Sequence, residues 1–170
     1  MPSRFPIAIR IHFITAIAVL GLVVVAALDA ASRSRQLEQD RTGLLRAVVQ
    51  TGLGIAAAEQ ALVARGEATM AEAQARAAAA IGAMRYLGQE YLWVNDMTPR
   101  MVMHPFRPEL NGRDVAGMQD PNGFHLFRAF VETARASPEG GVVGYLWPRP
   151  GAEQPVEKLS YVAAFAPWGW

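Results

Sequence analysis

The feature that most constrains this chain is a stretch without any charged side chain, from Ile11 to Leu28, bounded by Arg10 and Asp29. As a helix rising about 1.5 Å per residue, these eighteen residues span roughly 27 Å, close to the ~30 Å hydrocarbon thickness of a bilayer. The stretch therefore predicts a transmembrane helix over residues 7–28. A cleaved signal peptide is the alternative, although its apolar region usually runs only about 7–15 residues.

Positive charge does not decide the orientation of this helix. Arg4 and Arg10 precede the apolar stretch, whereas Arg33, Arg35 and Arg41 follow it closely. Either interpretation of the stretch sends the rest of the chain across a membrane. We expect the short tail on the inner side and the remainder outside.

Aromatic residues divide the remainder into two compositions. Residues 14–85 contain none, whereas all four Trp and all four Tyr lie at or beyond Tyr86. The expected organisation is therefore a tail and membrane helix over residues 1–29, followed by one domain over residues 30–170. We expect that domain to be helical over 30–88 and sheet-forming over 89–170. The predicted fold class is α+β.

Heptad spacing of apolar residues predicts one long amphipathic helix that continues from the membrane and weakens at Arg65-Gly66. The a and d positions are Leu37, Leu44, Val48, Thr51, Ile55, Ala58 and Leu62. A second, Ala-rich helix is expected from about Thr69 to Tyr86. Two interpretations of the first helix stay open: it packs only within its own domain, or it also forms the seam of a homodimer.

The segment YLWVNDMTPRMVMHP, from Tyr91 to Pro105, predicts two strands joined by a turn. Residues 91–95 alternate with the period of a half-buried strand, and residues 101–104 form the returning strand. Asp96 is expected to cap the turn between them. Further along, we expect a short helix and two more strands. The helix presents Phe124, Phe127, Val131 and Ala134 on one face, and the strands cover residues 142–147 and 158–165.

Composition excludes several function classes. A net charge of +1 gives no basic field for nucleic acid, and the absence of Cys excludes disulfides and thiol catalysis. The three His are scattered without metal-ligand spacing, so neither a metal nor a cofactor is expected. Catalytic motifs are absent too. Ser160, two residues from Lys158, supports only a weak alternative, a Ser–Lys hydrolase.

A pocket for a small anion is better supported. Lys158 is the single Lys of the chain and lies in a predicted strand, where it shares a face with Ser160. Burying a carboxylate requires a cation and hydrogen-bond donors. The candidate donors are Lys158, His104, Arg100, Arg85, Tyr161 and the Trp147 indole. Each has a plain structural alternative, such as an edge-strand charge for Lys158, a core imidazole for His104, or core packing for Trp93 and Trp147.

Four blocks together resemble the single Cache (PAS-like) sensor domains of bacterial methyl-accepting chemotaxis proteins. They are MRYLGQEYLWVNDMTPRMVMHP from Met84, PELNGRDV from Pro108, DPNGFHLF from Asp120, and GYLWPRPGAEQPVEKLSYVAAFAPWGW from Gly144. The resemblance covers about residues 30–170. It implies a long helix pair, an antiparallel PAS-like sheet, and an extracytoplasmic sensor domain of a membrane-bound chemoreceptor in the bacterial inner membrane.

The same resemblance implies a pocket for small organic acids of the acetate, propionate, pyruvate or lactate class. It assigns to the pocket Trp93, His104, Trp147, Lys158 and Tyr161, with Arg85 and Tyr86 at its closing edge. The alternative is a membrane-anchored dimerisation or protein-interaction module without a small ligand.

Two departures from the family pattern bear on these expectations. Leu87-Gly88 stands where such domains often have paired glycines, so the corner between helix and strand is expected to differ. The sequence also ends at Trp170, where relatives continue through another strand, a second membrane helix and a cytoplasmic region. We therefore expect the last strand of the sheet to be missing and one sheet edge to be unpaired.

Overall fold

The computed structural model describes residues 7–170, with the side chains of residues 7–15, 18 and 34 excepted. The tail of residues 1–6, expected on the inner side of a membrane, lies outside the described residues. Contacts divide the chain into two compact units, residues 1–41 and 42–170. Each unit is described by itself.

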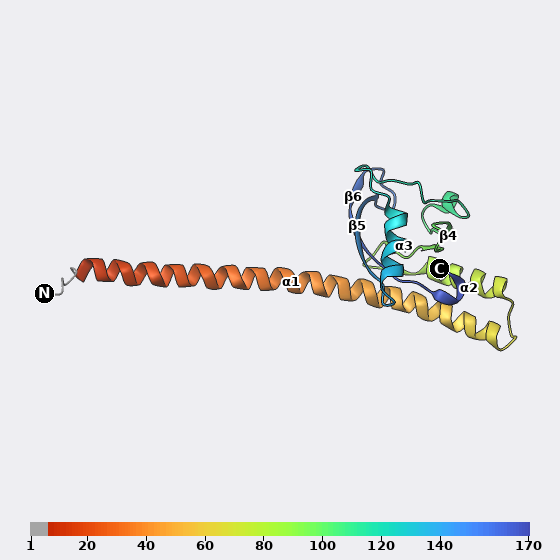
Figure 1. The fold of residues 1–170 in the computed structure, drawn as a ribbon, viewed down its shortest axis with the longest axis horizontal. Coiled ribbons are helices and arrows are strands. Elements are labelled where there is room, and N and C mark those ends of the chain that lie inside the picture. Colours follow the sequence, from red (N-terminus) through yellow and green to blue (C-terminus); the bar gives the residue numbers. More distant parts are fainter. Residues whose placement is uncertain (1–6) are drawn as a thin grey trace. The chain divides into compact units, whose positions relative to one another are not determined.

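Helix α1 runs from Ile7 to Ala64 (Figure 1). The prediction of a long helix ending before Arg65-Gly66 is confirmed, and Gly66 leaves the helix with a positive φ of 74°. In the first unit, all side chains of residues 19–33 are exposed. Within the described range, α1 is the one helix long and apolar enough to cross a membrane by length and composition. A helix that is apolar on all sides needs an apolar surrounding, which a bilayer supplies.

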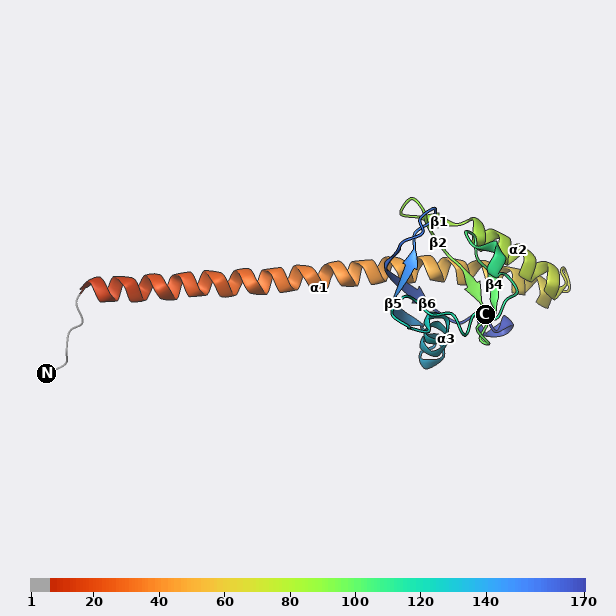
Figure 2. The ribbon, with the colours of Figure 1, turned by 90° about the horizontal axis from the view of Figure 1, so that it is seen from above.

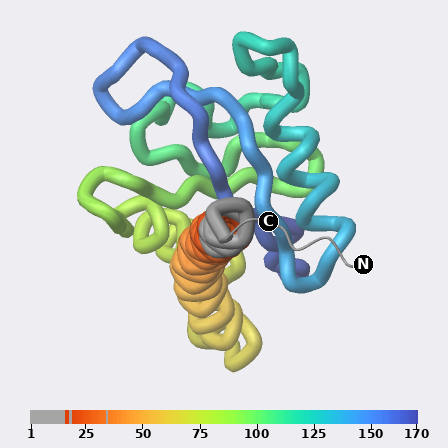
Figure 3. Tube along the Cα trace, turned by 90° about the vertical axis from the view of Figure 1, so that its left-hand side faces the viewer, coloured from red at the N-terminus to blue at the C-terminus, as the bar shows by residue number. Residues whose placement is uncertain are grey.

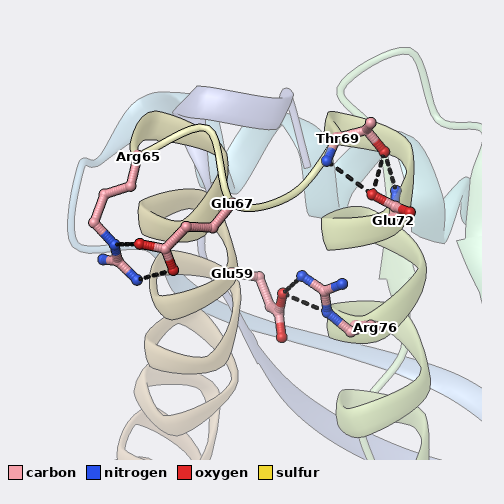
Figure 4. A network of polar contacts seen from close by, with 6 residues as sticks. All are labelled: Glu59, Arg65, Glu67, Thr69, Glu72 and Arg76. Atoms are coloured by element: carbon pink, nitrogen blue, oxygen red, sulfur yellow. Dashed lines mark hydrogen bonds and ion pairs between the residues drawn. The ribbon is translucent and has the colours of Figure 1, made fainter.

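Helix α2, Met70–Ala83, begins at a capping box that Figure 4 shows in detail. The Thr69 hydroxyl accepts a hydrogen bond from the Glu72 amide, while the Glu72 carboxylate accepts one from the Thr69 amide. An ion pair between Arg76 of α2 and Glu59 of α1 joins the two helices, at 2.6 Å. The polar network therefore fixes where the helix pair turns.

The second helix is shorter than the sequence predicts, because its expected last turn belongs to a small hairpin instead. Strand β1, Arg85–Tyr86, pairs antiparallel with β2, Glu90–Tyr91. The backbone of Leu87 in the connecting loop has a φ of 43°, which a helix does not allow. The helix consequently ends at Ala83 rather than Tyr86.

The predicted strand over residues 91–95 is split. Its first residue belongs to β2, and β3 covers only Val94–Asn95, paired with β4, Met101–Met103. Tyr91 and Leu92 are both buried, so the expected alternation of faces is wrong at this point. The predicted turn is confirmed, because the Asp96 carboxylate accepts hydrogen bonds from the amides of Thr98 and Arg100.

The second half contains helix α3, Leu126–Ala136, and the longest strands, β5 (Gly141–Pro148) and β6 (Pro155–Val162). Two short 3₁₀ turns, η1 (Pro108–Leu110) and η2 (Ala166–Trp168), complete the elements. Figures 2 and 3 show β5 running beside α3.

Some boundaries in this half differ from prediction. The helix begins after Phe124, which is exposed, and β6 lies three residues earlier than the predicted strand over 158–165. Gly140 explains the tight junction from α3 into β5, since a Cβ there would lie 2.1 Å from the carbonyl oxygen of Val162.

The core of the second unit lies between α3, β4 and β5. Its buried apolar residues are Met101, Leu110, Val115, Leu126, Phe127, Phe130, Val143 and Trp147. The strands of the described residues form three two-stranded antiparallel pieces, β1–β2, β3–β4 and β5–β6. The predicted combination of long helices with antiparallel strands, class α+β, is confirmed.

Candidate ligand-binding site

The register of the β5–β6 hairpin gathers the polar candidates on one face. Lys158 lies directly opposite Tyr145, and Ser160 lies opposite Val143. Directly opposed residues share a face of a sheet, so Tyr145, Trp147, Lys158 and Ser160 all point the same way. The hydroxyls of Tyr145 and Ser160 are 2.9 Å apart. The hydrogen-bond partner of the Ser160 hydroxyl is therefore the Tyr145 hydroxyl rather than the Lys158 ammonium.

Lys158 is the charged centre of a group that we call the Lys158 cluster, made of Glu90, Tyr91, His104, Arg107, Trp147 and Lys158. The Lys158 side chain is only 11% exposed. Its Nζ lies 2.8 Å from the Glu90 carboxylate and 5.2 Å from the centre of the Tyr91 ring. The ammonium is thus held between a carboxylate and an aromatic face, a cation–π arrangement.

His104 is buried in this cluster, with 4% exposure. Its Nδ1 accepts hydrogen bonds from the amides of Phe106 (3.3 Å) and Arg107 (3.1 Å). An acceptor Nδ1 places the ring proton on Nε2, which lies 3.4 Å from the Tyr91 hydroxyl. Burial lowers the pKa of His104 to about 4, and the Arg107 and Lys158 charges act in the same direction. Near neutral pH the imidazole is therefore an uncharged donor with a fixed tautomer.

Aromatic rings surround these polar groups. The Tyr91 ring packs edge-on against Phe106 at 4.9 Å, and Trp147 lies 6.1 Å from the His104 ring. The Arg107 guanidinium lies over Trp147 at 5.1 Å. Burial raises the pKa of Tyr91, so its hydroxyl keeps its proton as a donor. The cluster combines two cations, neutral donors and apolar walls.

The structure brings together three of the predicted site residues, namely His104, Trp147 and Lys158.

Two further predicted residues, Arg85 and Tyr86, lie at the edge of the cluster, on β1. The Arg85 guanidinium stacks over Phe106 at 4.8 Å and donates to the carbonyls of Gly82 and Met84. Tyr86 pairs with Glu90 across β1–β2, and burial raises the pKa of the Tyr86 hydroxyl.

Tyr161 and Trp93 are placed elsewhere. Tyr161 lies on the opposite face of β6 from Lys158, and its hydroxyl donates to the Glu139 carbonyl at 2.6 Å. The Trp93 indole donates to the Asn95 side chain. Both line a second feature, the apolar cavity, of about 110 Å³. Its other lining residues include Val49, Gly52 and Ala56 of α1, and Phe130, Val131 and Ala134 of α3.

Sequence reasoning missed Glu90, Tyr91 and Arg107 as members of the cluster. A signal for Glu90 was available: a lone Lys expected in a buried site requires a carboxylate, and Glu90 directly precedes the aromatic strand. Arg107 lies three residues after His104, where its amide caps the imidazole. Nothing in the alternation of residues 91–95 revealed that Tyr91 would face Lys158.

Several known proteins are similar to this chain. The family model described as "Single Cache domain 2" matches residues 37–170. McpP, a methyl-accepting chemotaxis protein of Pseudomonas putida, is 40% identical over 161 residues. The match covers 95% of this chain and 29% of McpP, so the chain spans less than a third of that relative's length. The sensor histidine kinase MctS of Rhizobium johnstonii is 29% identical over 98 residues.

Two solved structures are similar to this chain in both sequence and fold. A periplasmic sensor domain of a chemotaxis protein is 49% identical, with a TM-score of 0.74, covering 77% of this chain and 90% of that one. A Cache chemosensory domain studied for carboxylic acid recognition is 41% identical, with a TM-score of 0.77, covering 80% and 92%. Such domains are sensors of chemoreceptors rather than a class of enzyme. The chain belongs to the single Cache domain 2 family of chemosensory domains.

Proposed function

We propose that residues 30–170 form the extracytoplasmic sensor domain of a chemoreceptor that binds small carboxylates at the Lys158 cluster. Residues 7–28 hold it in the bacterial inner membrane. The observation that carries the proposal is the Lys158 ammonium, nearly buried and 2.8 Å from a carboxylate. Because the charge and donors of this site already bind the Glu90 carboxylate, they can bind the carboxylate of a ligand in its place.

Each part of the cluster has a role in this proposal. The Lys158 ammonium neutralises the ligand's charge, and Nε2–H of His104 and the Tyr91 hydroxyl donate hydrogen bonds to its oxygens. Arg107 adds a second positive charge beside Trp147. The rings of Tyr91 and Trp147 contact the short alkyl end. The 41%-identical domain studied for carboxylic acid recognition supports this ligand class.

Ligand size limits the affinity. A C2–C3 acid has about six heavy atoms or fewer, and the ceiling for very small ligands is about −1.5 kcal/mol per atom. The free energy of binding is then at most roughly −9 kcal/mol, which corresponds to a dissociation constant slightly below micromolar. We expect micromolar affinity.

Calorimetry with matched ligands tests the proposal. The full chain in detergent micelles is titrated with acetate, propionate, pyruvate and lactate, and separately with acetamide and propionamide. The amides have nearly the same shape as the acids but carry no charge. We expect heat from at least one acid and none from the amides. A folded sample that binds no acid, or that binds amides equally well, contradicts a carboxylate site.

The exposed apolar residues of helix α1 support a second partner for this chain, namely another copy of itself. Its buried residues in the second unit are Leu45, Gly52 and Ala56, whereas the predicted heptad stripe lies on the neighbouring face. In that stripe Leu44 remains 41% exposed, and Ile55 is only half-buried. We propose that this stripe forms a homodimer seam, compatible with sensing. Sedimentation of the full chain and of a Leu44→Glu, Ile55→Glu variant tests it, since a monomeric wild type would contradict the seam.

A further inference from the structure

The Glu90 carboxylate occupies the position in which the proposed function places the ligand's carboxylate. Its Oε2 lies 2.8 Å from Lys158 Nζ. Within residues 7–170, Glu90 is the only hydrogen-bond partner of that ammonium. Two carboxylates at one ammonium repel each other, so an incoming acid competes with Glu90.

The two partners of this ion pair differ in burial. The Lys158 side chain is 11% exposed, whereas that of Glu90 is 37% exposed. Leaving a buried ammonium without a counter-charge is costly, whereas a carboxylate at the rim regains water when it leaves. Glu90 is therefore the movable partner, and its departure is favourable only when another anion replaces it.

The segment that carries Glu90 is suited to movement. The β1–β2 hairpin has only two residue pairs, Arg85 with Tyr91 and Tyr86 with Glu90. Hairpins of this size are marginally stable alone. Leu87 in its loop is 73% exposed and is the only non-glycine residue with positive φ among those described. Displacing Glu90 therefore disturbs a small, strained element and leaves the core intact.

We propose that Glu90 is an internal competitor, a carboxylate that the β1–β2 hairpin holds on Lys158 in the ligand-free domain and that a small carboxylate displaces. This inference rests on the proposed function. Under this inference Glu90 helps to set the affinity of the domain for its ligand and its preference for anionic over uncharged ligands. It also couples binding to α2, because Arg85 of the same hairpin donates to the carbonyls of Gly82 and Met84 at the end of that helix.

Binding by two charge-neutralised variants tests the inference. Acetate and propionate are titrated into the full chain in detergent micelles, as wild type, Glu90→Gln and Glu157→Gln. The Gln side chain keeps the shape of Glu90 without its charge. We expect Glu90→Gln to bind about two- to fivefold more tightly, the range that loss of a partly exposed ion pair allows. Glu157 is the matched control, because it is exposed and adjacent to Lys158 but on the opposite face of β6.

The outcomes separate this inference from the proposed function. Acid binding by the wild type that becomes tighter in Glu90→Gln alone supports both. A wild type that binds acid while Glu90→Gln binds equally or more weakly overturns the competitor and leaves the sensor proposal standing. Absence of binding by all three proteins overturns both.

Hydrogen exchange in the wild type gives a second readout that needs no variant. With saturating acetate, the amides of residues 86–90 should exchange at least twofold faster than without ligand, because the hairpin loses its anchor on Lys158. Peptides from α3 serve as the internal reference. Unchanged or slower exchange in the hairpin overturns displacement even where acid binds.

Discussion

The Lys158 cluster and the apolar cavity are both lined by aromatic residues, and strand β6 contributes to each. Lys158 and Ser160 point to one face of the strand, and Tyr161 points to the other. The first face carries the Lys158 ammonium, whose side chain is 11% exposed, whereas the described residues that line the cavity include no Lys or Arg. In the cavity, the Tyr161 hydroxyl and the Trp93 indole are already bonded within the domain. Aromatic density is therefore common to both features, and the nearly buried cation beside fixed donors is what distinguishes the Lys158 cluster.

Among the variants that test this difference between the two features, Lys158→Met should have the largest effect on acid affinity. Met retains much of the apolar stem but removes the charge, so we expect acetate or propionate affinity to fall about 100-fold, or about 2.7 kcal/mol. The measurement is calorimetry on the full chain. Arg149→Met removes an exposed cation from the loop of the same hairpin and should leave affinity unchanged. Equal affinity of Lys158→Met and wild type would move the site away from the cluster.

Stability should depend on pH through His104. Its folded-state pKa of about 4 lies below the unfolded value of about 6.5, so the unfolded chain binds more protons between these values. Stability is therefore fully present above pH 6.5 and is lost as pH falls toward 4, by about 2 kcal/mol. Urea unfolding at pH 7 and pH 4.5 measures the difference, and His104→Gln should reduce it. A His104 ring signal titrating near pH 6.5 in nuclear magnetic resonance would contradict the neutral donor.

Much of the fold was predictable because its signals are local. The end of α1 follows from Arg65-Gly66, and the turn at Asp96 follows from hydrogen bonds within four residues. The end of α2 was not predictable, because the Ala-rich composition continues while the chain leaves the helix at Met84. There the pairing of β1 with β2, a tertiary feature, overrides helix propensity.

The arrangement of the candidate site was predictable in part. Alternation correctly placed Lys158 and Ser160 on one face, and the same parity rule puts Tyr161 on the other. Tyr161 was nevertheless named as a candidate donor for its hydroxyl, and the family resemblance then assigned it to the pocket despite its place on the other face. Glu90 and Arg107 could not be found from periodicity, since they reach the cluster from a small hairpin and from a loop. Such contacts depend on how distant segments meet.

The smallest effect should come from Tyr161→Phe, which tests whether the cavity face takes part in binding. The variant leaves the Glu139 carbonyl without its donor, so the free energy of unfolding should fall by about 1 kcal/mol. Acid affinity should be the same as in the wild type, because the hydroxyl points away from Lys158. Urea unfolding and calorimetry on the same samples measure both quantities. Weaker acid binding at unchanged stability would instead join the two faces of β6 into one site, since the hydroxyl would then act on the ligand and not on the fold.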